Sequence, residues 1–128
     1  FTEALLPRTD ANWHLTVRDT RADADEGWNL SLKLASPFTS AVDGVSTLPN
    51  TGGWGLVMAD GLGGFHSLDG TAYPIASKNY RPGDVPDEDT LDIGWAAERG
   101  LMLRVPPATP VVEGDYCATL TWTLSVGP

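Results

Sequence analysis

The chain has 128 residues, 41% of them hydrophobic, with ten prolines, fourteen glycines and a formal net charge of −9. This length is typical of a single domain, and so many prolines and glycines exclude a fold built on long helices. The negative charge argues against nucleic acid and anionic lipid as partners, and no stretch approaches the roughly 20 apolar residues of a membrane span.

Residues 1–11 form an N-terminal arm with three large apolar side chains, Phe1, Leu5 and Leu6, followed by Pro7. Such an arm is too apolar to remain loose in water, and the proline prevents it from continuing as a central strand. We expect it to lie along a sheet edge, its own more readily than a neighbour's. Because the chain begins with Phe1 and not Met, we expect a processed or trimmed product, for which a missing signal peptide carries no information.

Apolar and polar residues alternate in several segments, as in strands with one buried and one solvated face. These segments are 13–18, 28–34 and 116–126, and shorter strand candidates are 55–59, 90–96 and 101–105. Residues 36–53 and 74–90 are expected to be irregular. We therefore predict one all-β domain over residues 12–128, an antiparallel β-sandwich or barrel-like domain with long irregular loops.

Two Trp-x-Leu triplets, Trp28-Asn29-Leu30 and Trp122-Thr123-Leu124, carry the most specific signal in the chain. The first follows Val-Arg-Asp-Thr-Arg at residues 17–21, and the second lies in the C-terminal segment Tyr-Cys-Ala-Thr-Leu-Thr-Trp-Thr-Leu. The arrangement resembles the WxL domain, a C-terminal cell-surface module of Gram-positive bacteria. The resemblance runs from about Trp13 to Pro128, with its motifs at the two ends.

This resemblance implies a secreted, non-catalytic domain without cofactors on the bacterial surface. Its expected partners are peptidoglycan or another cell-wall glycan, bound non-covalently, and other surface proteins. WxL domains usually carry an apolar β segment well upstream of the first triplet, where this chain has only residues 1–11. A missing strand would leave an open sheet edge, so self-association as a subunit of an extracellular filament or surface layer is the alternative.

The tryptophans can be read in two ways. In a strand, Trp122 shares a face with Leu120 and Leu124, so the triplets are either a core signature or partly exposed platforms on which a sugar ring stacks. Trp54 lies in a glycine-rich stretch where no neighbour is expected to cover its ring. The candidate binding residues are Trp28, Leu30, Trp122 and Leu124 of the triplets, with Trp54 and Trp95 as alternative platforms.

Two patterns contain residue types found in calcium sites or hydrolase triads, but both favour an interpretation without such a site. Asp84, Asp87 and Asp89 are weak calcium candidates, because their run lacks EF-hand spacing and is more typical of a solvated loop. The run His-Ser-Leu-Asp at residues 66–69 contains the residue types of a hydrolase triad, but neighbours in sequence rarely converge as the triad requires. With no Gly-x-Ser-x-Gly elbow either, we expect no enzyme.

Two further motifs are expected to be structural. Cys117 is the single cysteine, so it is expected to be a small half-buried side chain, with an intermolecular disulfide as the alternative. Residues 48–52 spell the sortase pentapeptide Leu-Pro-Asn-Thr-Gly, but they precede a large part of the predicted domain and suit an ordinary turn.

Overall fold

The chain is seen here in a computed structural model, which describes residues 3–6, 8–10, 12–21, 26–81 and 89–126. The strands are β1 (Ala4–Leu6), β2 (His14–Asp19), β3 (Trp28–Ser40), β4 (Gly55–Ala59), β5 (Phe65–Ser67), β6 (Tyr73–Lys78), β7 (Asp89–Gly94), β8 (Gly100–Val105) and β9 (Tyr116–Val126). Every strand pairing is antiparallel. The predicted all-β antiparallel class is confirmed.

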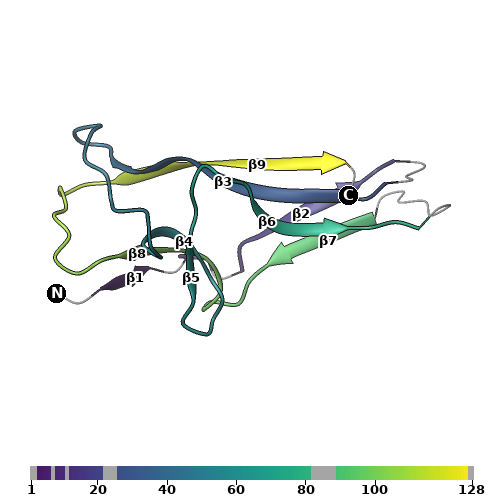
Figure 1. Ribbon diagram of the computed structural model, residues 1–128, viewed down its shortest axis with the longest axis horizontal. Coiled ribbons are helices and arrows are strands. Elements are labelled where there is room, and N and C mark those ends of the chain that lie inside the picture. The colour runs from purple at the N-terminus through teal and green to yellow at the C-terminus, as the bar shows by residue number, and fades with distance from the viewer. Residues whose placement is uncertain (1–2, 7, 11, 22–25, 82–88, 127–128) are drawn as a thin grey trace.

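The strands form three sheets, with the orders β6-β3-β9, β1-β8-β4-β5 and β2-β7. The long strands β3 and β9 run along the longest axis of the molecule, with β1, β4, β5 and β8 toward one end and β2 and β7 toward the other (Figure 1). Within the described residues no sheet closes on itself. The arrangement is therefore sandwich-like and not a closed barrel.

Strand β3 supplies side chains to both halves of the core, because its alternate residues from Trp28 onward face the same side. One cluster of buried residues contains Leu32, Leu34, Leu56, Met58, Leu68 and Leu101. The other contains Val17, Trp28, Leu30 and Ile93. The alternating pattern of β3 thus packs both of the other sheets against the same long strand.

The two Trp-x-Leu triplets lie side by side in the β3–β9 pair. Leu30 is paired with Leu124, Trp28 with Val126, and Leu32 with Trp122. Residues directly opposite one another on neighbouring strands are within side-chain contact. The register therefore brings together two motifs that are more than 90 residues apart in the sequence.

Two segments that were expected to be irregular are partly strands, so those predictions were wrong. Strand β3 continues to Ser40, and its pairing with β9 shifts register on both sides of Ser36, next to Pro37. Strand β6 contains Pro74 but lies at the edge of its sheet, opposite a register shift in β3. A proline is tolerated at an edge or bulge because no ladder hydrogen bond requires its missing N–H.

The N-terminal arm pairs within its own chain, as expected. Strand β1 is the edge strand next to β8, with Ala4 opposite Val105 and Leu6 opposite Leu103. The carboxylate of Glu3 also forms an ion pair with Arg104 of β8, with a closest distance of 2.7 Å. The arm is therefore a part of this fold.

The Val-Arg-Asp-Thr-Arg motif before the first triplet is built around an ion pair. The guanidinium of Arg21 donates through Nε to Oδ1 of Asp19 at 2.9 Å and through Nη2 to Oδ2 at 2.7 Å. Asp19 is buried, and these bonds lower the pKa of its carboxyl from 3.8 to about 2. This pair stabilises the end of β2 beside the first triplet.

The structure also shows the positions of Cys117 and of the Leu-Pro-Asn-Thr-Gly segment. Cys117 is exposed, so the expected half-buried position was wrong. In the Leu-Pro-Asn-Thr-Gly segment, Leu48 is buried and Oδ1 of Asn50 accepts a hydrogen bond from the N–H of Leu56 at 2.8 Å. That segment closes the turn before β4. The described residues include no helix with the length and apolar character needed to cross a membrane.

Candidate functional site

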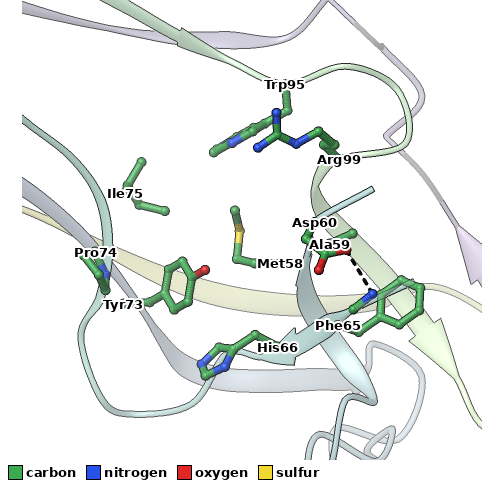
Figure 2. A pocket seen from close by; sticks show the side chains of 11 residues that line it. Met58, Ala59, Asp60, Phe65, His66, Tyr73, Pro74, Ile75, Trp95 and Arg99 are labelled. Carbon is green, nitrogen blue, oxygen red and sulfur yellow. Dashed lines mark hydrogen bonds between the residues drawn. The ribbon is translucent and has the colours of Figure 1, made fainter. Parts of the chain in front are cut away.

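A cleft of about 400 Å³ opens where β4, β5 and β6 meet the loop between β7 and β8 (Figure 2). Its volume lies within the range of small-ligand sites. It is lined by Met58, Ala59, Asp60, Gly64, Phe65, His66, Tyr73, Pro74, Ile75, Trp95 and Arg99. These residues come from five separate segments, and only the fold brings them together.

Aromatic side chains stand at opposite ends of the cleft. Figure 2 shows Trp95 at one end and Tyr73 with His66 at the other, with Met58 and Ile75 between them. The rings of His66 and Tyr73 lie 4.8 Å apart between centroids, tilted by 38°. The cleft therefore combines an apolar middle with two aromatic walls that carry polar edges.

The charged rim consists of Asp60 and Arg99. Oδ1 of Asp60 accepts hydrogen bonds from the N–H groups of Leu62 at 2.7 Å and Gly64 at 2.9 Å. These bonds, and the positive charge of Arg99, hold the pKa of the Asp60 carboxyl below its ordinary value. Asp60 thus stays ionised and holds the β4–β5 turn, while the side chain of Arg99 lies beside Trp95 at the same end of the cleft (Figure 2).

The loop that carries Trp95 and Arg99 is fixed by Arg8, which follows β1. Nη1 of Arg8 donates to the carbonyl oxygens of Arg99 at 2.8 Å and Leu101 at 3.0 Å. Nη2 donates to the carbonyl oxygens of Trp95 and Ala96, both at 3.2 Å. A planar guanidinium suits this multiple recognition, since its donors point in fixed directions.

The ring of Trp95 has close neighbours as well. Trp13 stacks on it, with ring centroids 6.2 Å apart and an interplanar angle of 13°. At Gly100, where φ is +87°, an added Cβ would lie 2.5 Å from a ring atom of Trp95. Glycine is therefore required at this position on two grounds, backbone conformation and space.

Trp54 is not the open platform that its glycine-rich context predicted. The guanidinium carbon of Arg104 lies 3.9 Å from the centroid of the Trp54 ring and 4.3 Å from that of Phe65. Arg104 also donates through Nη1 to the carbonyl oxygen of Gly53 at 3.1 Å. Arg104 is distant in sequence but pairs with Gly55 across the β4–β8 ladder, so the covering residue comes from tertiary structure.

The triplet residues are not equivalent to one another. Trp28 and Leu30 are buried in the core, which agrees with the structural interpretation. Trp122 is partly buried and packs against both core clusters. Leu124, on the same strand, is 55% exposed. None of these four residues lines the cleft that Trp95 enters.

The side chains of the His-Ser-Leu-Asp run at residues 66–69 have different partners. Ser67 donates to the carbonyl oxygen of Trp54 at 2.8 Å, and Asp69 accepts from the N–H of Thr71 at 2.7 Å, while His66 packs on Tyr73. These side chains therefore have separate structural roles. Asp84 and Asp87 lie outside the described residues, and among those described no three His, Cys, Asp or Glu side chains gather as metal ligands.

Of the six sequence-predicted binding residues, the cleft contains Trp95 alone. Tyr73, His66 and Arg99 were not identified as binding residues from the sequence. Tyr73 and Ile75 do alternate as strand residues, but Pro74 between them masked that signal. In comparisons with protein-family models, curated proteins and solved structures, none matches this chain.

Proposed function

We propose that this chain is a non-catalytic glycan-binding module that holds its protein non-covalently on the wall of a Gram-positive bacterium. The observation that carries the proposal is the cleft between Trp95 and Tyr73. Sugar rings present a C–H face that packs on aromatic rings, and hydroxyl groups that pair with charged and polar side chains. The cleft offers both kinds of contact.

The wall and the bacterial surface come from the resemblance of the two Trp-x-Leu triplets to WxL domains. The charge of the chain bears on how such binding would work. With a net charge of −9, the domain cannot rely on attraction to anionic wall polymers. Binding in an aromatic cleft would instead depend on short-range contacts, which salt screens little.

The lining of the cleft supports a binding role in preference to hydrolysis, because Asp60 is the one carboxylate among the described residues that line it and glycoside hydrolysis uses a pair. A glycosidase needs a carboxylic acid with a raised pKa that donates a proton to the leaving group. In this cleft the hydrogen bonds from Leu62 and Gly64 lower the pKa of Asp60. Its carboxylate is suited to accept hydrogen bonds from hydroxyl groups and to hold its own turn.

The alternative of a self-assembling filament subunit has less support. It would use the N-terminal arm as a segment that lies in a neighbour's groove. In the structure β1 pairs with β8 of its own chain, and Glu3 pairs with Arg104. The arm is therefore already engaged.

Co-sedimentation with insoluble Gram-positive peptidoglycan tests the proposal. The wild-type chain should sediment with it both near physiological ionic strength and in about 1 M salt, where the screening length falls to about 3 Å. His66→Ala and Arg99→Ala should each weaken binding by roughly five- to twentyfold, which corresponds to about 1 to 2 kcal/mol.

His14→Ala and Arg81→Ala are matched controls, since both residues are exposed and neither lines the cleft. They should bind as the wild type does. No sedimentation, sedimentation that vanishes in high salt, or equal binding by all four variants would contradict the proposal.

A further inference from the structure

A second concave surface, separate from the cleft, runs between the edge strands β2 and β9. Two adjoining hollows of about 240 and 200 Å³ share Val17, Arg18 and Leu124, so they form one groove. Its apolar lining is Leu15 and Val17 of β2, Trp28 and Leu30 of β3, and Trp122, Leu124 and Val126 of β9. No residue of this groove lines the cleft.

The groove lies where the two facing sheets differ in width. The sheet β6-β3-β9 has three strands, and the sheet that packs against it at this end has two, β2 and β7. Residues of β2 and β9 line the groove together. The two-stranded sheet therefore lacks a strand next to β2, at the position that would face β9. The sheet β2-β7 is thus one strand narrower than the sheet β6-β3-β9 that it packs against.

The consequence is visible in the exposure of β9. Leu124 is 55% and Val126 63% exposed, although their paired residues Leu30 and Trp28 are buried. Within the described part of the chain, β2 pairs only with β7 and β9 only with β3. Among the described strands, the groove is therefore bordered by two sheet edges, one of β2 and one of β9, that pair with no further strand.

This geometry points to one occupant: an extended segment of another protein, about six residues long, that adds to β2 as a third strand. The length follows from β2, whose six residues form the edge to be matched. Alternate side chains of such a segment would be apolar and pack on Trp122 and Leu124, because a strand presents one face to the groove. The remaining side chains would face solvent.

A second copy of this chain fits the groove poorly. Its described strands already direct their apolar faces into their own core, so an edge-to-edge dimer would leave Leu124 and Val126 uncovered. Two domains with a net charge of −9 each would also repel one another. A neutral or basic segment with both faces free meets both requirements.

The inference does not depend on the glycan proposal, and a pair of synthetic peptides tests it. One is Lys-Thr-Val-Thr-Leu-Thr-Val-Lys, with apolar residues at alternate positions. The other has the same composition with the apolar residues consecutive, Lys-Val-Leu-Val-Thr-Thr-Thr-Lys. Amide NMR titration with hydrogen exchange should show that the alternating peptide binds more tightly, shifts the Trp122 indole signal and protects amides of β2.

Leu124→Arg places a charge in the groove and should weaken binding of the alternating peptide by roughly tenfold or more. Leu62→Arg is the matched control, because Leu62 is 90% exposed on a turn away from the groove, and it should have no effect. Equal binding of the two peptides, or protection confined to other strands, would overturn the inference. So would protection of β2 that rises with protein concentration alone, since that result would identify a second copy as the occupant.

Discussion

The guanidinium of Arg8 lies over the ring of Trp95, 5.7 Å from its centroid, and donates a hydrogen bond to the carbonyl oxygen of the same residue at 3.2 Å. Arg8 belongs to the N-terminal arm and Trp95 to the loop that forms one wall of the cleft. The arm therefore acts on the candidate binding site through this residue. Its four carbonyl contacts hold the cleft wall in place.

Arg8→Lys should lower both stability and glycan binding. A lysine ammonium keeps the charge but lacks the planar fork, so several of the four carbonyl contacts would be lost. We expect a loss of about 2 to 4 kcal/mol in the free energy of unfolding, measured by urea denaturation. Lys33→Arg, at an exposed position, is the control. If Arg8→Lys kept both the wild-type midpoint and wild-type sedimentation with peptidoglycan, the proposed role of Arg8 would be wrong.

The two triplet tryptophans should differ in their effects on stability. Trp28 is only 4% exposed, so Trp28→Ala should destabilise the fold by about 3 to 5 kcal/mol. Trp122 is partly buried, and Trp122→Ala should cost less, about 1 to 3 kcal/mol. Leu124→Ala, at an exposed position, should cost under about 1 kcal/mol. Chemical denaturation measures all three, and equal costs for Trp28 and Trp122 would contradict this ranking.

Stability should fall in acid, because Asp19 has a lowered pKa in the folded state. Its pKa is about 2 when folded and 3.8 ordinarily, so its contribution is full above about pH 4 and is lost as the pH falls toward 2. Asp19→Asn should destabilise the protein at neutral pH by about 1 to 3 kcal/mol and make the loss between pH 4 and 2 shallower.

Asp43 and Asp60 also have lowered pKa values, so part of the acid dependence should remain in that variant. Asp115→Asn, which changes an exposed carboxyl, is the control. Thermal melting at several pH values provides the comparison. An Asp19→Asn profile parallel to that of the wild type would show that the pair with Arg21 does not carry this dependence.

Removing residues 1–7 should lower the melting temperature without changing the oligomeric state. The deletion removes β1 and the Glu3–Arg104 ion pair but keeps Arg8. Since Leu5 and Leu6 are 43% and 51% exposed, the loss should be modest, about 1 to 2 kcal/mol or a few degrees. Light scattering should show the same mass as the full chain. A lost assembly with an unchanged melting temperature would instead indicate that the arm packs on a neighbour.

Much of the strand content could be predicted from local pattern alone. Strands β4 and β9 have the predicted bounds, because the apolar run of β4 and the period-two alternation of β9 require only neighbouring residues. Strand β6 was missed because Pro74 argues against a strand unless the strand is known to lie at an edge. Edge position is a property of the sheet and cannot be read from the segment itself.

The sequence by itself determined that the chain is an antiparallel all-β domain and that Trp28 and Trp122 lie on strands. Only the tertiary structure decided which apolar side chains are accessible: Arg104, distant in sequence, covers Trp54, and the difference in sheet width exposes Leu124 beside buried Leu30. The cleft likewise depends on Arg8 holding the loop of Trp95 and Arg99. Alternation reports which residues share a face, but burial of that face depends on what packs against it, and that is set by contacts between distant segments.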